Sequence, residues 1–439
     1  MFLHPRTQVL SPAQGVIGLS TSPPEESSSH PSTSRTGPLP RTVWVLSWIS
    51  FFADVSSELI YPILPFLAVG AIGLSRFHLG VIEGGAVLLV AIMSAWAGIH
   101  SDRSPSYGRL LWIRVGYGLP MLARVIIAVA SSGWMLACGR LMDRFGKGLR
   151  GAPRDSLLAD CVDSSQLGRA FGLHRAMDTA GALAGVVLAA ALMVYFDLSP
   201  SDESGRTDIE GSLRGIIWIG ALLGLFAFVI TWRIPASSEH SSPSREAIER
   251  VERNAPLNRQ YWRLLAVLIL FSLANSSDAF LLLRVVDLGF SATGAVMLYA
   301  VYNALYALAS YPLGYLSDRI DRRYLIGIGW SIYAMVYVAL GLLSPETRGW
   351  VWPILAMYGL YMACTDGIGK AMVADLVPKG SRGKAMGLYY AATGVSQLVA
   401  SGMMGWVWDS NGATLPFLIS GLLALAATIA ILFTQPSKR

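Results

Sequence analysis

The stretch Gly98-Ile99-His100-Ser101-Asp102-Arg103 returns as Gly314-Tyr315-Leu316-Ser317-Asp318-Arg319, about half of the 439-residue chain further on. Each copy follows one apolar run and precedes another. Each therefore predicts a tight polar turn between two membrane-length helices. A pattern that repeats at half the chain length indicates that the protein consists of two related halves.

Two further sequence repeats have nearly the same separation along the chain. Ala159-Asp160 and the segment 168–173 (GRAFGL) recur as Ala374-Asp375 and the segment 383–388 (GKAMGL). Ser56-Ser57-Glu58 returns more faintly as Ser276-Ser277-Asp278. Echoes that recur in the same order predict a duplicated membrane protein, because internal repeats are a common way of building such folds.

The composition excludes a soluble globular domain. The chain is 53% hydrophobic and only 14% charged, whereas about a quarter of the residues in soluble domains are charged. A transmembrane helix needs about 20 mostly apolar residues. The sequence predicts twelve such spans, six in each half, at residues 42–69, 79–99, 110–131, 133–152, 171–195, 214–234, 262–286, 292–316, 324–343, 351–373, 386–408 and 415–434.

The basic residues predict the orientation of the chain. The formal net charge is +6, but the basic residues concentrate in alternate loops between the spans, as they do in cytoplasmic loops. We therefore expect both termini in the cytoplasm, a location in the inner (cytoplasmic) membrane, and no nucleic-acid partner.

Composition also predicts the domain organisation. Residues 1–41 are rich in Ser, Pro and Thr and are expected to form a disordered cytoplasmic tail rather than a signal peptide. Residues 42–235 are expected to form the first six-helix bundle and residues 261–435 the second. Residues 236–260, rich in Ser and then in Arg and Glu, form the predicted central cytoplasmic loop.

From roughly residue 42 to residue 435 the chain resembles the major facilitator superfamily. The turn with Gly98, Asp102 and Arg103 is similar to the signature of that superfamily between its second and third spans. The resemblance implies an all-α membrane fold of 6+6 helices in two pseudo-symmetric halves. It also implies a cytoplasmic gate that closes when the central cavity opens outward, formed by Gly98, Asp102, Arg103, Gly314, Asp318 and Arg319. A purely topological anchor is the alternative role for these turns.

The fourth span also resembles the superfamily pattern. Arg140 stands twenty residues before Asp160, the spacing at which the family places a buried arginine on this helix. Arg144 departs from the pattern, because a small residue is usual there. Lys147 and Arg150 extend the basic run, and their alternative role is to anchor the helix to anionic lipid. The run resembles a branch of bacterial facilitators with largely unassigned substrates.

The fifth span bears on the class of substrate. Gly181 and Gly185 keep a small-residue spacing that lets helices pack closely. Val186 stands where drug–proton antiporters of the superfamily carry a proline. This departure weakens the resemblance to multidrug antiporters without removing it.

Ionisable residues within the spans are the candidate functional groups, because each costs about 2.5–3.5 kcal/mol to insert. Asp54 and Glu58 lie one helical turn apart and share a face of the first span. Two carboxylates so close in a low-dielectric medium repel each other, so we expect one of them to carry a proton in one conformation. The alternative is that one acid only neutralises a buried arginine.

The remaining candidates lie mostly in the first half. Asp178 is expected to pair with His174 or with Arg140. The full set of candidate proton-coupling and substrate-coupling residues is Asp54, Glu58, Glu83, Arg124, Arg140, Arg144, His174, Arg175, Asp178 and Asp278. The second half is richer in aromatic residues, and its tyrosines are candidates for a substrate face or for helix packing.

These features predict a monomeric secondary active transporter that works by alternating access in a lipid bilayer, with a small-molecule substrate. Proton-coupled efflux of a small organic solute is the favoured activity. The alternatives are proton-coupled uptake of an organic anion, drawn by Arg140 and Arg144, and metal-ion efflux. A polytopic membrane enzyme and a non-transporting receptor are alternatives from other classes. No phosphate-binding loop, nucleophile elbow or clustered metal ligands occur in the sequence, so no enzymatic activity, cofactor or bound metal is expected.

Overall fold

The fold is described from a computed structural model of the chain. The structure describes residues 38–101, 106–162, 166–196, 206–235, 257–317, 319–365, 368–377 and 382–434. The regular structure of these residues is helical. The predicted tail, most of the predicted central loop and the inner turns at Asp102 and Asp318 lie outside these ranges.

Six long helices follow one another in the part of the first half that the structure describes. They are α1 (Arg41–Ile60), α2 (Arg76–Ser101), α3 (Ser106–Ala128), α4 (Gly133–Asp160), α5 (Leu167–Tyr195) and α6 (Arg206–Ile230). A π-helical turn, η1 (Phe66–Ala71), lies between α1 and α2, and a 3-10 turn, η3 (Thr231–Arg233), follows α6. The first predicted span therefore ends its α-helix at Ile60 rather than near residue 69.

The described part of the second half contains eight helices. The helices are α8 (Arg259–Ala274), α9 (Ala279–Asp287), α10 (Ala292–Ser317), α11 (Arg322–Leu342), α12 (Val351–Thr365), α13 (Ile368–Asp375), α14 (Arg382–Asn411) and α15 (Thr414–Leu432). A 3-10 segment, η5 (Pro345–Trp350), precedes α12. The seventh predicted span is interrupted between α8 and α9. The tenth contains α12 and α13, and the two residues between them lie outside the described ranges.

Within the described residues, nine segments are long and apolar enough to cross a membrane by length and composition. They correspond to α1, α2, α3, α5, α6, the α8–α9 pair, α10, α11 and α15. Three further predicted spans correspond to α4, α12–α13 and α14. Of these, α4 carries five basic and three acidic residues, and α12 has only 15 residues. The fourth span was also predicted too short, since α4 continues to Asp160.

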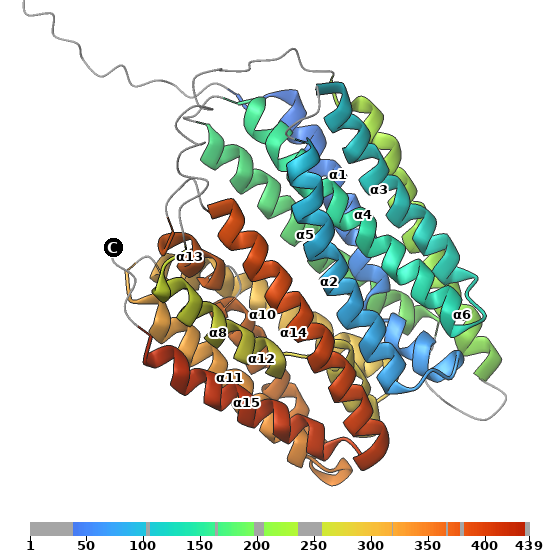
Figure 1. The fold of residues 1–439 in the computed structure, drawn as a ribbon. Coiled ribbons are helices and arrows are strands. Elements are labelled where there is room, and N and C mark those ends of the chain that lie inside the picture. The colour runs from blue at the N-terminus through green and yellow to red at the C-terminus, as the bar shows by residue number, and fades with distance from the viewer. Residues whose placement is uncertain are drawn as a thin grey trace, which may run out of the picture. The chain divides into compact units, whose positions relative to one another are not determined.

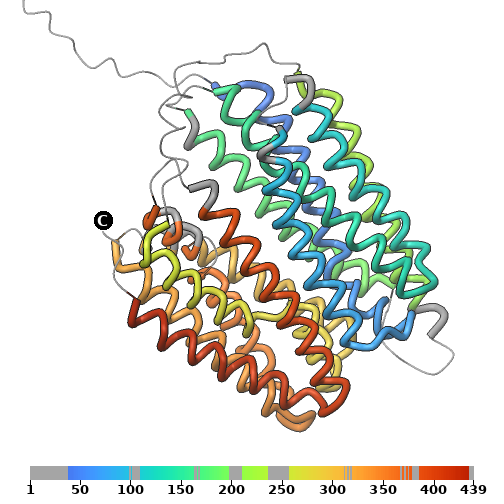
Figure 2. The backbone as a smooth tube through the Cα atoms, in the orientation of Figure 1, coloured from blue at the N-terminus to red at the C-terminus, as the bar shows by residue number. Residues whose placement is uncertain are grey.

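The helices form two groups. Figure 1 shows α1 to α6 beside one another and α8 to α15 in a second group, and the tube in Figure 2 shows the same division by colour, from blue to yellow-green and from yellow to red. The main contacts between the groups run from α2 to α14 and from α5 to α10. This arrangement confirms the predicted all-α membrane fold in two halves.

Glycine allows the close approach of helices both between and within the halves. A Cβ atom at Gly84 of α2 would lie 2.5 Å from the Cα of Leu398 on α14. Within the first half, a Cβ at Gly181 of α5 would lie 2.5 Å from the carbonyl oxygen of Phe51 on α1, and Gly185 is as crowded against Val55. The prediction that Gly181 and Gly185 permit close helix packing is therefore confirmed.

A polar contact joins the halves where α2 begins and α14 ends. The backbone N–H groups of Arg76 and Phe77 donate to the Asp409 carboxylate at 3.3 and 3.0 Å. The Arg76 guanidinium lies over the Trp408 ring at 5.0 Å and 3.4 Å from an Asp409 oxygen. Because an acid at a helix N-terminus satisfies free N–H groups and opposes the helix dipole, Asp409 caps a helix of the other half. We call these four residues the clasp.

Candidate functional site

A buried ion pair joins α2 to α4 inside the first half. Arg140 donates through Nε and Nη2 to the two carboxylate oxygens of Glu83, both at 2.7 Å. The two side chains are 6% and 4% exposed. The Arg140 guanidinium also lies 5.2 Å from the centre of the Tyr61 ring. A bidentate pair with this geometry is strong and fixes the orientation of both side chains, so Arg140 and Glu83 hold each other.

Asp143 of α4 is a residue that sequence reasoning did not select. It lies among three arginines of α3 and α4. Its carboxylate is 3.6 Å from Arg124, 3.7 Å from Arg140 and 3.6 Å from Arg144. Arg124 of α3 also donates to the Ser56 hydroxyl on α1 at 2.7 Å, and Ser56 in turn donates to the carbonyl of Gly220 on α6. The signal for Asp143 was its spacing, three residues after Arg140 on the same helix face.

Asp54 and Glu58 both face the cations of α4, but they differ in their partners. Asp54 is 3.9 Å from Arg150, whose guanidinium also covers the Tyr117 ring. Glu58 forms no ion pair with any residue that the structure describes. Instead it accepts a hydrogen bond from Tyr299 on α10, at 3.3 Å. Glu58 is half-buried. Because its hydrogen-bond donor belongs to the second half, Glu58 lies at the contact between the two halves.

The predicted pairing of His174 with Asp178 is present on α5. His174 Nδ1 lies 3.6 Å from Asp178 Oδ2. His174 Nε2 and Asp178 Oδ1 are buried and have no hydrogen-bond partner in the described part of the chain. The alternative pairing of Asp178 with Arg140 is not formed, because Glu83 occupies Arg140. Arg175, the next residue on α5, is exposed.

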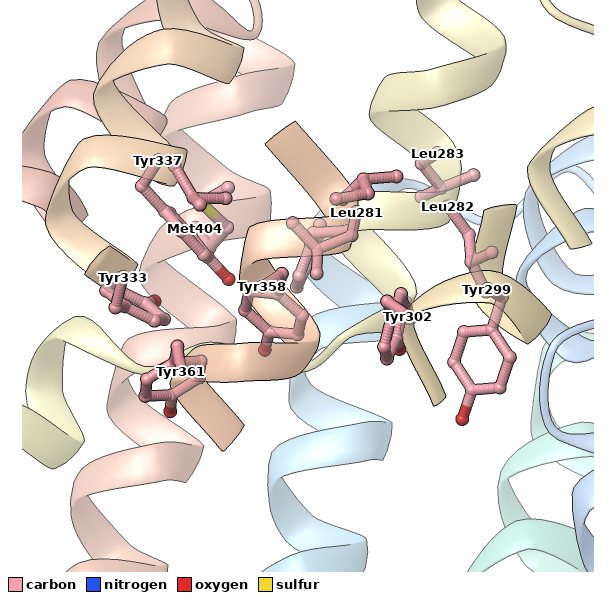
Figure 3. Close-up of a cluster of buried hydrophobic side chains, with 14 of the residues drawn as sticks. Leu281, Leu282, Leu283, Tyr299, Tyr302, Tyr333, Tyr337, Tyr358, Tyr361 and Met404 are labelled. Atoms are coloured by element: carbon pink, nitrogen blue, oxygen red, sulfur yellow. The ribbon is translucent and has the colours of Figure 1, made fainter. Parts of the chain in front are cut away.

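Asp278 lies at the break between α8 and α9 and is surrounded by aromatic side chains. It accepts hydrogen bonds from Tyr302 of α10 at 3.0 Å and from Tyr358 of α12 at 2.6 Å. No ion pair reaches it from the described residues. Figure 3 shows Tyr302 and Tyr358 near four further buried tyrosines of the second half, Tyr299, Tyr333, Tyr337 and Tyr361. Sequence reasoning selected Asp278, and it named Tyr302 among the candidates for a substrate face or for helix packing, but it did not predict that Tyr302 and Tyr358 would bind Asp278.

The two halves carry matching ion pairs at the ends that were predicted to face the cytoplasm. Arg109 at the start of α3 pairs with Asp160 at the end of α4, and Arg322 at the start of α11 pairs with Asp375 at the end of α13. Asp160 and Asp375, which correspond in the sequence repeat, thus form corresponding ion pairs in the structure. Of the predicted gate, Gly98 and Gly314 lie in the last turns of α2 and α10, and Arg319 is exposed in the turn after α10. Asp102, Arg103 and Asp318 lie outside the described residues.

Comparison with known proteins decides the family. The model of the Major Facilitator Superfamily matches residues 46–365 and 280–439. The chain belongs to the major facilitator superfamily. It is 30% identical to an uncharacterized MFS-type transporter of Methanocaldococcus jannaschii, over 90% of this chain and 95% of that protein.

Two other similarities are more distant. The chain is 23% identical to the multidrug resistance protein MdtH of Edwardsiella ictaluri, over 86% of this chain and 89% of the relative. A crystal structure of a bacterial homolog of the human lysosomal transporter Spinster, inward-facing and occupied, matches with a TM-score of 0.70 and 16% identity. This match covers 89% of this chain and 96% of that one, and it shows a shared fold. Membership of the superfamily makes this protein a membrane transporter.

Proposed function

We propose that this facilitator couples the movement of a small organic solute to protons by alternating access, with Glu58 as the proton-carrying group. The observation that carries the proposal is the position of Glu58. It is a half-buried carboxyl group without an ion pair in the described residues, and its hydrogen-bond donor, Tyr299, belongs to the other half. Most other acids of the first half are neutralised by arginine, so a proton on Glu58 changes the local charge without breaking a strong pair.

The coupling follows from the neighbours of Glu58. On its own helix it faces Asp54, from α4 it faces Arg140, Arg144 and Lys147, and from α10 it faces Tyr299. The ionised form of Glu58 is attracted to the cations of α4, whereas the protonated form loses that attraction. A conformational equilibrium shifts only by a difference in interaction energy between its states. Proton transfer at Glu58 supplies such a difference at the contact between the halves.

Two directions of transport are candidates. Efflux of a small organic solute is supported by the similarity to relatives named multidrug resistance proteins. Uptake of an organic anion is supported by the excess of cations on α4. For either activity we propose a monomer in a cytoplasmic membrane. The distribution of basic residues in the loops supports termini on the inner side. The gating role of Asp102 and Asp318 belongs to the same proposal.

Proteoliposome transport tests the proposal. A counterflow screen of radiolabelled small carboxylates, sugars, nucleosides and drug cations first identifies a transported solute. An imposed proton gradient should then drive its accumulation in the wild-type protein, and an uncoupler should abolish that accumulation. Glu58→Gln should retain counterflow but lose gradient-driven accumulation. Full accumulation by Glu58→Gln would show that the proton is carried elsewhere.

A further inference from the structure

Two cations of α4 remain without a strong partner. Lys147 makes no hydrogen bond and no ion pair with any residue that the structure describes, and it is half-buried. Among the described residues, the ion pair of Arg144 is with Asp143, at 3.6 Å, and the Arg144 side chain is 13% exposed. Among the described residues, no nitrogen atom of either side chain is both fully buried and without a hydrogen-bond partner. Their N–H groups therefore reach accessible space.

The other cations of the cluster are already occupied. Arg140 is held by both oxygens of Glu83, Arg124 donates to Ser56, and Arg150 lies beside Asp54 and over Tyr117. Asp143 is shared among three guanidinium groups, so it does not fully neutralise Arg144. Binding capacity for an added anion is thus concentrated on Arg144 and Lys147. The sequence had assigned this role to Arg140 and Arg144.

The charges of the cluster do not balance. Its cations are Arg124, Arg140, Arg144, Lys147 and Arg150, and its acids are Asp54, Glu58, Glu83 and Asp143. One positive charge is in excess when every group is ionised, and a proton on Glu58 leaves two in excess. Uncompensated charge inside a membrane protein is costly. An anion at Arg144 and Lys147 removes that cost, and it does so most effectively when Glu58 is protonated.

We infer that Arg144 and Lys147 bind the anionic group, a carboxylate or a phosphate, of a transported organic solute. Proton uptake by Glu58 strengthens this site, so the proton and the anion move together as a symport. The inference rests on the proposed function of Glu58. The same cluster repels an organic cation, which distinguishes this site from the acidic sites that a drug-cation antiporter requires.

The test measures the thermal unfolding midpoint of the purified protein in detergent. The probes are benzoate, lactate and glycerol 3-phosphate, each at millimolar concentration, with benzamide, lactamide and glycerol as matched neutral molecules. At least one anion should raise the midpoint, its neutral partner should not, and the effect should increase as the pH is lowered, because proton uptake by Glu58 adds to the excess positive charge. Stabilisation by no anion, or equally by the neutral partner, overturns the inference.

Variants assign the effect to the site. Lys147→Gln should weaken the apparent affinity for the anion at least about tenfold, which is about 1.4 kcal/mol. Lys147→Arg should retain most of it, and Arg263→Gln, which removes an exposed charge from α8, should leave it unchanged. Equal affinity in Lys147→Gln and the wild type overturns the inference. Stabilisation by phosphatidylglycerol in mixed micelles, but by none of the soluble anions, shows a lipid site and also overturns it.

The behaviour of Glu58→Gln separates this inference from the proposed function. Glutamine imitates the protonated acid, so the variant should lose the pH dependence of anion binding and should bind the anion more tightly than the wild type does at high pH. If anion binding depends on Lys147 but is independent of pH in the wild type, the anion site stands and the proton-carrying role of Glu58 fails. If accumulation is proton-driven but Lys147→Gln binds the anion normally, the proton-carrying role of Glu58 stands and the anion site fails.

Discussion

The segment Ser56-Ser57-Glu58 and its echo Ser276-Ser277-Asp278 occupy corresponding places in the two halves, but their acids have opposite surroundings. Glu58 lies in a continuous helix and faces the cations of α4. Asp278 lies at a break in the helix and accepts hydrogen bonds from Tyr302 and Tyr358. The first half of the fold thus has a charged interior, and the second half has an aromatic interior.

The difference indicates a division of labour. Charged clusters respond to protons and anions, because each gain or loss of charge alters all of their interactions. Tyrosine hydroxyls stay neutral over the physiological range and hold an acid in place without adding a charge. We therefore assign coupling to the first half and a mainly structural role to the tyrosine cluster of the second.

The largest effect should come from breaking the charged interior. Glu83→Gln leaves Arg140 buried without its bidentate partner, so the free energy of unfolding should fall by about 3–5 kcal/mol. Thermal unfolding in detergent measures this loss. The matched control is Glu210→Gln, because Glu210 also binds an arginine, Arg214, at 2.7 Å but at an exposed position of α6. There the cost should be about 0–1 kcal/mol, and equal losses at the two sites would contradict the account.

The second largest effect should come from the contact between the two halves, where α2 packs against α14. Gly84→Ala places a Cβ 2.5 Å from the Cα of Leu398, so α2 and α14 must separate at a cost of about 3 kcal/mol. Transport should fall strongly. Gly85→Ala is the adjacent control, because its Cβ would meet nothing nearer than a Leu141 methyl group at 3.9 Å. The two variants should differ clearly in counterflow rate, and equal rates would show that close approach here is unimportant.

A smaller effect should come from the aromatic interior. Tyr358→Phe removes the 2.6 Å hydrogen bond to Asp278 and should cost about 1.5 kcal/mol of stability, since bonds to charged groups contribute about 1.5–3 kcal/mol. Tyr337→Phe is the control, because the Tyr337 hydroxyl belongs to the same aromatic interior but is not one of the hydrogen-bond donors to Asp278 in the described part of the chain. Proton coupling should survive in both variants. Uncoupled transport in Tyr358→Phe would move the coupling function into the second half.

The smallest effect should come from the clasp. Asp409→Ala removes a helix cap between the halves, which is worth about 0.5–2 kcal/mol, and should favour the state in which that end is open. The readout is the thiol reactivity of a cysteine placed at Ser401 in a cysteine-free background, which should rise. Asp287→Ala, which breaks an ion pair within the second half, should leave that reactivity unchanged. A rise in both variants would indicate general loosening.

The sequence predicted the membrane class, the two halves and most helices, because apolar runs and repeats are local signals. It also selected nearly all of the charged residues in the cluster. It did not predict that Glu83 would hold Arg140, that Asp143 would bind three arginines, or that tyrosines would hold Asp278. These pairings depend on the rotation and spacing of helices distant in sequence, which tertiary packing determines. The break at Asp278 was missed although four polar residues, 275–278 (NSSD), interrupt the apolar run there.

The central claim is that coupling depends on Glu58 and not on its counterpart Asp278. The most direct measurement compares gradient-driven accumulation with counterflow of the same solute in Glu58→Gln and Asp278→Asn proteoliposomes. We predict that Glu58→Gln loses accumulation while keeping counterflow, and that Asp278→Asn lowers both by the same factor because it disturbs packing. Loss of accumulation alone in Asp278→Asn, with coupled transport in Glu58→Gln, would contradict the account.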